Sequence, residues 1–253
     1  MKPPAWIYRL YEHHVLRQLR GAKLPEHIGV MLDGNRRWAR EFGHSVRYGH
    51  KRGADKIDEF LGWCDQVHIP LVTLWLLSTD NLGRDEEEVA DLLHIISTAV
   101  THLASLHQWR IRIVGSMDLL PSEFVAQLTD AATRTADVDG LTVNIAVGYG
   151  GREEITDAVR SLLREEAAAG KTLEDVATSI SVEDIAAHLY TSGQPDPDLV
   201  IRTSGEQRMS GFMLWQSVHT ELYFCEAYWP DFRRTDFLRA LRDYTQRERR
   251  KGK

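Results

Sequence analysis

Short apolar runs alternate along this chain with stretches that have helical spacing, and this alternation is the feature that most constrains the fold. The runs lack the apolar-polar alternation of half-exposed strands. Strands that are apolar on both faces, each followed by a helix, form parallel sheets that helices cover on both sides. We therefore expect an α/β fold with a central, mainly parallel β-sheet flanked by helices.

The predicted strands are Ile28–Asp33, Leu71–Leu77, Ile111–Gly115, Leu141–Val147, Leu199–Arg202 and Glu221–Phe224. The predicted helices are Gly49–Val67, Glu86–Leu106, Ser122–Ala136, Arg152–Ala169, Val182–Leu189 and Phe232–Arg249. No repeat or low-complexity linker divides the sequence, so we expect one domain over residues 1–253. An amphipathic helix within residues 1–22 and a basic helix and tail at 233–253 would begin and end it.

Composition narrows the class of protein. The 253 residues are 43% hydrophobic and 27% charged, which is enough apolar material for a large core. The two cysteines, Cys64 and Cys225, are far apart and form no CxxC pattern, which favours a reducing compartment over a disulfide framework or a zinc site. We expect no membrane span, because no apolar run reaches membrane-spanning length, and no signal peptide, because the N-terminus lacks the apolar h-region of one. We therefore expect a cytoplasmic protein.

The net charge of −6 is unevenly distributed. Residues 1–23 hold five basic residues and one acid, and residues 233–253 hold nine basic residues and three acids, so residues 24–232 carry −16. An acidic body argues against nucleic-acid binding. The basic ends suit phosphates, lipid head groups or a partner chain. The stretch Trp6–Leu19 predicts a helix that either packs on its own domain, which we favour, or contacts the inner membrane surface peripherally.

A candidate phosphate site follows the first predicted strand. Asp33 ends the strand, Gly34 and Asn35 form a turn, and a helix can begin at Arg36. Backbone N–H groups of a helix N-terminus attract phosphate, and a neighbouring carboxylate suits Mg²⁺, which takes few protein oxygens. The alternative is an ordinary strand-turn-helix corner, because Asp-Gly-Asn is a common turn sequence.

Two further strand ends carry arginine and hydroxyl groups. The second strand is followed by Ser78–Arg84, and the fifth by a segment containing Arg202, Arg208 and Ser210. Arginine forks and hydroxyl groups match phosphate oxygens. Because the carboxyl ends of parallel strands lie at one edge, these clusters predict two anionic groups held close together, with a metal between them.

Several segments in this chain occur together in one known family. They are His27–Trp38, Tyr48–His50, Ser78–Arg84, Asn144–Arg152, Leu199–Gln216, Glu221–Phe224, Trp229–Phe232 and Arg247–Gly252. In these segments the chain resembles the cis-prenyltransferases, the Z-type isoprenyl diphosphate synthases that include undecaprenyl diphosphate synthase. The runs Trp75–Thr79 and Tyr190–Asp198 are also similar to those of short-chain actinobacterial (2Z,6E)-farnesyl diphosphate synthases.

The resemblance implies an Mg²⁺-dependent, homodimeric transferase that condenses isopentenyl diphosphate with an allylic diphosphate and forms a cis double bond. By the family pattern, Asp33 holds Mg²⁺ and the allylic diphosphate, and Glu221 is the second acid at the metal. The implied catalytic residues are Asp33, Asn35, His50 and Asn81. The implied substrate-binding residues are Gly34, Arg37, Trp38, Arg47, Leu76, Ser78, Thr79, Arg84, Arg202, Arg208, Ser210 and Arg250.

Some of these implied roles have alternatives. Arg202, Arg208 and Ser210 look like the isopentenyl diphosphate site. His50 orients a diphosphate or removes a proton in one interpretation, and makes a structural hydrogen bond in the other. Long-chain members carry an arginine at the position of Val46, whereas here Arg47 comes one residue later, so its phosphate contact is an open question.

The C-terminal residues resemble the family's Arg-x-Gly ending, here Arg250-Lys251-Gly252. In the family this tail reaches across a dimer interface to the partner's isopentenyl diphosphate. The alternative is a solvated chain end.

Product length is expected to depend on Leu76. Long-chain members typically have Ala-Phe where this chain has Leu76-Leu77, in the segment that lines the prenyl tunnel. A leucine in place of alanine fills the volume of several methylenes and predicts an early stop. The alternative is that Leu76 points away from the tunnel.

We therefore expect condensation of isopentenyl diphosphate with geranyl diphosphate to give (2Z,6E)-farnesyl diphosphate. Alternatives are a longer polyprenyl product, branching condensation of two allylic diphosphates, or a non-catalytic partner subunit.

Overall fold

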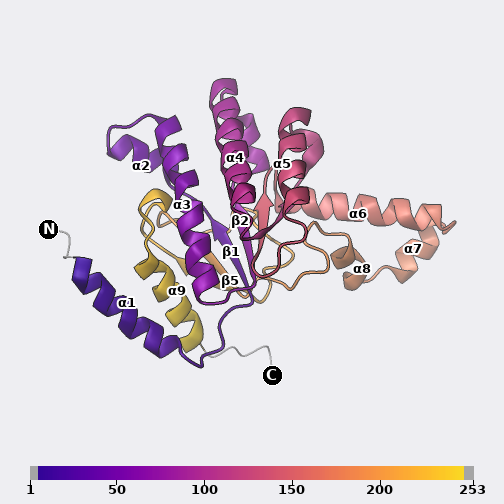
Figure 1. Cartoon of the computed structure of the whole chain (residues 1–253). Coiled ribbons are helices and arrows are strands. Elements are labelled where there is room, and N and C mark those ends of the chain that lie inside the picture. Colours follow the sequence, from indigo (N-terminus) through magenta and orange to yellow (C-terminus); the bar gives the residue numbers. More distant parts are fainter. Residues whose placement is uncertain (1–4, 248–253) are drawn as a thin grey trace.

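The computed structural model describes residues 5–247 and contains a six-stranded sheet in the order β3-β4-β2-β1-β5-β6 (Figure 1). Every pair of neighbouring strands is parallel. The predicted α/β class and all six predicted strands are confirmed. The strands are β1 His27–Met31, β2 Leu71–Trp75, β3 Arg110–Val114, β4 Thr142–Ala146, β5 Leu199–Arg202 and β6 Glu221–Phe224.

The helices are α1 Ala5–Leu19, α2 Asn35–Glu41, α3 Val46–Gln66, α4 Glu86–Leu106, α5 Ser122–Arg134, α6 Gly151–Ala168, α7 Leu173–Ser179, α8 Val182–Ala187 and α9 Arg234–Gln246. The short 3₁₀ helices are η1 Thr79–Gly83, η2 Met117–Leu119 and η3 Trp229–Asp231. α3 begins before the predicted Gly49 because the Ser45 hydroxyl accepts a hydrogen bond from the Tyr48 amide at 3.2 Å. α7 was not predicted, although Thr172 and Asp175 form a capping box at its start.

Side chains that alternate along β1 belong to two cores. Ile28 and Val30 lie in the larger core, to which α3, α4, α5 and α9 contribute. Met31 lies in the smaller core on the other face, with Tyr149 and Phe212. Figure 1 shows α3, α4 and α5 side by side over the sheet. Burial on both faces explains why the strands are continuous apolar runs.

The parallel arrangement places the carboxyl ends of β1, β2 and β5 next to one another, because these strands are neighbours in register. Asp33, Ser78 and Thr203 follow these three ends. Sequence segments that are far apart along the chain therefore meet at one edge of the sheet, where ligands bind in folds of this kind.

α1 packs against α9, as the favoured interpretation of this helix predicted (Figure 1). Val15 is buried, and the Glu12 carboxylate accepts a hydrogen bond from the Thr235 hydroxyl at 2.9 Å. The opposite side of α1 keeps Trp6 61% exposed and Leu10 63% exposed. Packing on its own domain therefore leaves an apolar patch on this helix.

α4 is the one helix in residues 5–247 that is long and apolar enough to cross a membrane by length and composition. This differs from the expectation that no apolar run reaches that length. In the fold, α4 contributes Leu92, Ile96, Val100 and Leu103 to the large core. These contacts are those of a core helix in a globular domain.

Candidate active site

Asp33 lies just beyond the carboxyl end of β1, where Gly34 turns the chain into α2. Gly34 has φ +103°, and a Cβ there would lie 2.7 Å from the Tyr228 ring, so the turn requires glycine. The Gly34 amide donates a hydrogen bond to Asp33 Oδ1 at 2.7 Å. α2 has only seven residues, so its dipole is short and the nearby arginines supply most of the positive charge.

Arg202 is the last residue of β5, and its side chain links the Asp33 turn with the segment that contains Arg208 and Ser210. Its Nη2 donates to Asp33 Oδ2 at 2.9 Å, and its Nη1 donates to the Ser210 hydroxyl at 2.9 Å and to the Arg208 carbonyl. Burial alone would raise the pKa of Asp33, but the Arg202 hydrogen bond and the charges of Arg202 and Arg37 together hold that pKa below its usual value. Asp33 is therefore an ionised carboxylate.

Glu206 bridges the arginines of the two clusters. Its carboxylate accepts from Arg37 Nη1 at 2.8 Å and also from Arg208 Nη1. Arg37 Nη2 donates to the Ser204 hydroxyl at 2.7 Å. The loop after β5 thus brings Arg37 and Arg208 to one carboxylate, which supports the prediction of two adjacent anion sites.

Asn35 lies where α2 crosses α3. Its Nδ2 donates to the Leu32 carbonyl at 3.2 Å, whereas its buried Oδ1 has no hydrogen-bond partner. A Cβ on Gly53 of α3 would lie 2.3 Å from that Oδ1, so only glycine allows this close crossing. This Oδ1 is therefore enclosed where the two helices cross, although Asn35 itself contributes to the cavity lining.

His50 is buried on α3, beside an ion-pair cluster. Its Nε2 lies 3.8 Å from Glu88 Oε1 and makes no hydrogen bond. Glu88 pairs with Arg84 at 3.0 Å and with Arg36 at 3.4 Å. Burial first, and then the Arg84 charge, lower the pKa of His50 to about 4. His50 is consequently neutral near pH 7, with one unpaired ring nitrogen.

Ser78 and Asn81 form a capping box at the start of η1, after β2. The Ser78 hydroxyl accepts from the Asn81 amide at 3.1 Å, and the Asn81 Oδ1 accepts from the Ser78 amide at 3.4 Å. Both residues line the same cavity as Asp33. Their two local hydrogen bonds fix this turn at the wall of the cavity.

These residues surround a cavity of about 510 Å³ that has two chemically different parts. One part holds six arginines and two aspartates: Arg36, Arg37, Arg40, Arg84, Arg202, Arg208, Asp33 and Asp80. The other part is apolar and is lined by Ile57, Leu76, Leu92, Ile95, Ile96 and Ala99. Such a cavity suits a ligand with an anionic head and a hydrocarbon tail.

Twelve of the seventeen predicted site residues line this cavity, and one more lies outside residues 5–247. The lining residues are Asp33, Gly34, Asn35, Arg37, His50, Leu76, Ser78, Asn81, Arg84, Arg202, Arg208 and Ser210. Leu76 is among these lining residues, so its side chain lies beside the cavity. Arg250 lies outside residues 5–247, so its predicted contact is not described.

Four predicted residues lie away from the cavity lining. Trp38 stacks with His44 and Tyr48, at ring-centroid distances of 5.6 and 6.1 Å, where α2 meets α3. Arg47 pairs with Asp91 at 3.3 Å on the outer side of α3. Thr79 follows Ser78 and lies beside Gly150, where a Cβ would meet its hydroxyl at 2.7 Å.

Glu221 is the fourth of these residues. It is the first residue of β6 and lies opposite Leu199 on β5, which in turn lies opposite Ile28 on β1. Arg202 lies three residues further along β5, toward the carboxyl ends of the strands. Three residues of strand rise about 10 Å. Glu221 therefore lies near the amino ends of the strands, whereas Asp33 lies beyond their carboxyl ends. The Glu221 carboxylate accepts a hydrogen bond from Arg247 Nη1 at 2.5 Å.

Sequence reasoning did not assign roles to Glu88, Glu206, Arg36, Arg40 or Asp80, which the structure places at or beside the cavity. The first arginine of the Asn-Arg-Arg run was a usable signal for Arg36. Glu88 gave no such signal, because it belongs to the acidic first turn of α4, and acidic residues are common at the N-terminus of any helix.

A metal at this site would rely on few protein ligands. Within residues 5–247, no group of three or more His, Cys, Asp or Glu side chains converges on a metal position. Asp33 is nevertheless an ionised carboxylate in the arginine-lined part, with 35% of its side chain exposed. This donor set fits a cation such as Mg²⁺ that takes one carboxylate and completes its coordination with phosphate oxygens and water.

Comparisons with known proteins identify the family. A family model described as putative undecaprenyl diphosphate synthase matches residues 31–252. The chain belongs to the cis-prenyltransferase family. It is 58% identical to the (2Z,6E)-farnesyl diphosphate synthase of Thermobifida fusca, over 97% of each chain. It is 57% identical to isoprenyl transferase 1 of Corynebacterium efficiens, over 99% of this chain and 98% of that one.

The structural comparison agrees. A crystal structure of lavandulyl diphosphate synthase from Lavandula x intermedia, in complex with dimethylallyl diphosphate, matches with a TM-score of 0.84 and 32% identity. The match covers 91% of this chain and 99% of that one. The resemblance found in the sequence motifs is thereby confirmed, and this cis-prenyltransferase has the fold that the resemblance implied.

Proposed function

We propose that this cis-prenyltransferase condenses isopentenyl diphosphate with geranyl diphosphate and releases (2Z,6E)-farnesyl diphosphate. The observation that carries the proposal is the two-part cavity, in which an arginine-lined end adjoins an apolar end. The printed name of the Thermobifida fusca relative supports the same product. The presence of Asp33, Arg202 and Arg208 argues against a non-catalytic partner subunit.

The two diphosphates are assigned to adjacent groups. Asp33, Gly34, Asn35 and Arg37 would bind the allylic diphosphate, and the loop after β5 would bind isopentenyl diphosphate through Arg202, Arg208 and Ser210. As the new carbon–carbon bond forms, the allylic carbon–oxygen bond breaks and a proton leaves the isopentenyl unit. Negative charge then builds on the departing pyrophosphate, where fixed arginines stabilise it.

His50 is assigned a positioning role at the allylic diphosphate. A base with a pKa of about 4 is a weak proton acceptor near pH 7, whereas its unpaired Nε2 can make a hydrogen bond. Asn81 would offer its amide in the same cavity, together with Ser78 and Arg84. These roles extend the family resemblance residue by residue.

Mg²⁺ is the proposed cofactor, held by the Asp33 carboxylate and the oxygens of the bound diphosphate. When bound, it would neutralise charge on the leaving pyrophosphate. Diphosphate binding can draw Arg202 and Arg37 toward phosphate oxygens, and this would free Asp33 from its ion pairs.

Leu76 is the proposed stop for chain growth. It lines the apolar part of the cavity, and its amide is fixed to the Ala146 carbonyl at 3.0 Å, so the side chain cannot withdraw by a small backbone shift. Replacing leucine with alanine would lengthen the apolar part by several methylene volumes. Leu76→Ala should therefore extend the product beyond fifteen carbons.

The test is product analysis with Mg²⁺, isopentenyl diphosphate and one allylic starter at a time: dimethylallyl, geranyl or (E,E)-farnesyl diphosphate. A single cis addition to geranyl diphosphate is the expected result. A long polyprenyl ladder, or a branched product formed from dimethylallyl diphosphate alone, would overturn the proposed product while leaving the family unchanged.

A homodimer is proposed because Glu221 cannot reach Asp33 within one chain. If Glu221 serves the metal, as the family pattern implies, it must do so in a second copy. Sedimentation of the protein should show a dimer. Mixing Asp33→Ala with Glu221→Ala chains should restore about a quarter to a half of the activity if the sites are shared between chains, and none if they are not.

Peripheral membrane contact is proposed for the exposed side of α1, in an otherwise cytoplasmic protein. Trp6, Ile7 and Leu10 are exposed there, next to Arg9. Both cysteines are free and buried, consistent with a reducing compartment. Co-sedimentation with vesicles rich in phosphatidylglycerol should weaken in Leu10→Ser, and equal sedimentation would contradict this contact.

A further inference from the structure

The hydroxyl of Thr203 binds both main-chain groups of Asp33. It accepts a hydrogen bond from the Asp33 amide at 3.0 Å and donates one to the Asp33 carbonyl at 2.7 Å. The Met31 carbonyl lies further from the same oxygen, at 3.3 Å. Thr203 is fully buried, directly after the last residue of β5, and does not line the active-site cavity. It therefore acts on the site through the position of Asp33.

Two consecutive residues hold Asp33 at different points. Arg202 donates to the Asp33 carboxylate at 2.9 Å, and Thr203 holds the Asp33 main chain. The first contact can be exchanged, because the same guanidinium is assigned to a diphosphate. The second contact offers nothing to a phosphate, since the hydroxyl is buried and both of its bonds go to the protein. When Arg202 turns to the substrate, Thr203 therefore continues to hold Asp33.

Thr203 is itself firmly placed. The carbonyl of Arg202 accepts from the Cys225 amide at 2.8 Å, and the amide of Ser204 donates to the Ala227 carbonyl at 2.8 Å. The residues on both sides of Thr203 are thus bonded to the segment that ends β6 and follows it. A β-branched side chain also has few rotamers. The hydroxyl is therefore a rigid support, and not one of several positions of a mobile side chain.

We propose that Thr203 is a positioning residue for the metal. Its hydroxyl keeps Asp33 where the carboxylate can bind Mg²⁺ after Arg202 and Arg37 have turned to phosphate oxygens. This inference rests on the proposed function, which assigns Mg²⁺ to Asp33. Groups that hold a metal ligand in place contribute about ten- to a hundredfold to metal affinity. An effect of that size is expected from the loss of this one hydroxyl.

The test variant is Thr203→Val, which keeps the shape of the side chain and removes the hydroxyl. The Asp33 amide also donates to the Met31 carbonyl at 2.9 Å, and the Asp33 carbonyl also accepts from the Trp229 amide at 3.0 Å. Both main-chain groups therefore keep a partner, so the variant should fold. Thr203→Ala is a second variant without the hydroxyl, and Thr203→Ser, which retains it, should behave as the wild type.

The readout is calorimetric binding of inorganic pyrophosphate, with and without Mg²⁺. In the wild type, Mg²⁺ should raise the affinity. In Thr203→Val this gain should shrink by about tenfold or more, while the affinity without Mg²⁺ should not fall. In turnover, the Mg²⁺ concentration that gives half the maximal rate should rise in parallel. The KM for isopentenyl diphosphate should not change, because Thr203 has no contact with Arg208 or Ser210.

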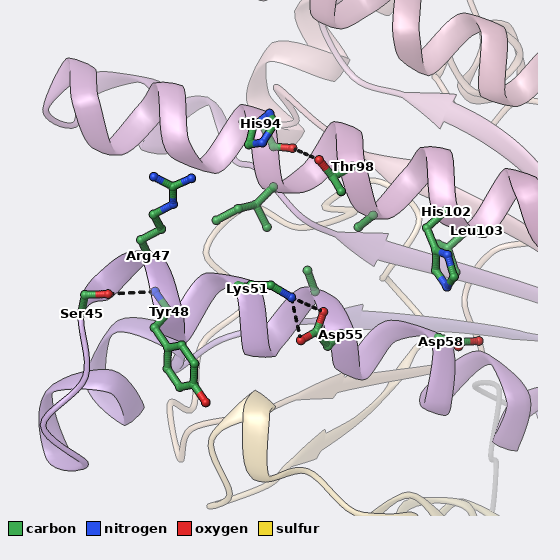
Figure 2. Close-up of a pocket in the computed structure, with 13 residues that line it drawn as sticks. Ser45, Arg47, Tyr48, Lys51, Asp55, Asp58, His94, Thr98, His102 and Leu103 are labelled. Atoms are coloured by element: carbon green, nitrogen blue, oxygen red, sulfur yellow. Dashed lines mark hydrogen bonds and ion pairs between the residues drawn. The ribbon is translucent and has the colours of Figure 1, made fainter.

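Two other threonines provide matched controls. Thr135 is equally buried at the end of α5, where its hydroxyl accepts from the Ile111 amide at 3.0 Å and donates to the Ala131 carbonyl at 3.1 Å. Thr98 lies in the cavity between α3 and α4 that Figure 2 shows, and it donates to the His94 carbonyl at 2.8 Å. Thr135→Val and Thr98→Val should keep the full effect of Mg²⁺.

The outcomes separate this inference from the proposed function. Wild-type protein that makes no fifteen-carbon product overturns the proposed product, and pyrophosphate affinity that is independent of Mg²⁺ overturns the metal assignment. With a Mg²⁺-dependent wild type, a full Mg²⁺ effect in folded Thr203→Val or Thr203→Ala overturns the positioning role. An equal loss of affinity with and without Mg²⁺ also overturns it, as does a folded Thr203→Ser variant that loses the Mg²⁺ effect.

Discussion

Acid should destabilise this protein through His27, a buried residue at the start of β1. His27 Nδ1 donates to the Pro195 carbonyl at 2.8 Å, and its Nε2 accepts from the Thr73 hydroxyl at 2.8 Å. That hydroxyl accepts in turn from Asn144 Nδ2 at 2.9 Å. The network therefore specifies the neutral ring, because a proton on Nε2 would point at the Thr73 hydroxyl and require it to turn.

Burial lowers the pKa of His27 from 6.5 to about 4, although the Pro195 hydrogen bond and the Asp198 charge act in the opposite direction. The unfolded state then binds a proton more readily than the folded state. The stabilisation is fully present above pH 6.5 and is lost as the pH falls from 6.5 toward 4. Linkage gives a loss of about 2 kcal/mol between pH 7.5 and pH 5, approaching about 3 kcal/mol at lower pH.

The assay is urea unfolding at pH 7.5 and pH 5, for the wild type and for His27→Gln. Glutamine keeps one donor and one acceptor but does not titrate, so the variant should lose about 2 kcal/mol less than the wild type over this interval. His13→Gln, at an exposed position on α1, is the matched control. Parallel pH profiles for wild type and His27→Gln would refute the reasoning, whatever their absolute stabilities.

Three substitutions and one labelling experiment test the site and the core. Asp33→Ala should lower kcat by about a hundredfold or more with an unchanged circular dichroism spectrum; near-normal turnover would remove Asp33 from the metal and diphosphate site. Arg208→Ala should raise KM for isopentenyl diphosphate about tenfold or more and affect the allylic KM less; equal changes would contradict the division of the two sites. Leu76→Ala should give products longer than fifteen carbons by mass spectrometry, and an unchanged product would exclude it as the stop. Because burial raises the pKa of both Cys64 and Cys225, the native protein should react with a thiol reagent only after denaturant is added; fast labelling without denaturant would show an open core.

The strands were predictable because fully buried parallel strands leave an unbroken apolar run in the sequence. Glu221–Phe224 was found in this way even though it is an edge strand with half-buried side chains. α7 was missed because its seven residues are mostly exposed and carry little periodic apolar signal. A short helix of this kind depends on its capping box, which sequence patterns reveal only when they are sought.

The site was predictable where strand ends determine position. Asp33 follows β1 and Arg202 is the last residue of the neighbouring β5, so topology alone brings them together, and they form an ion pair. Trp38 and Arg47 lie on helices, where a small rotation decides whether a side chain faces the cavity or the outside. Glu206 was missed because it lies in a loop, where no regular spacing in the sequence indicates which arginine a carboxylate will contact.

The Glu206 contacts affect how binding should respond to salt. In the absence of substrate, Glu206 and Asp33 already act as internal counterions for Arg37, Arg202 and Arg208. An arriving diphosphate therefore exchanges one anion for another and releases few dissolved ions. The affinity for diphosphate should fall less steeply with ionic strength than six arginines in one cavity would suggest, so the enzyme can select its substrate by shape and chain length across a wide range of cellular salt.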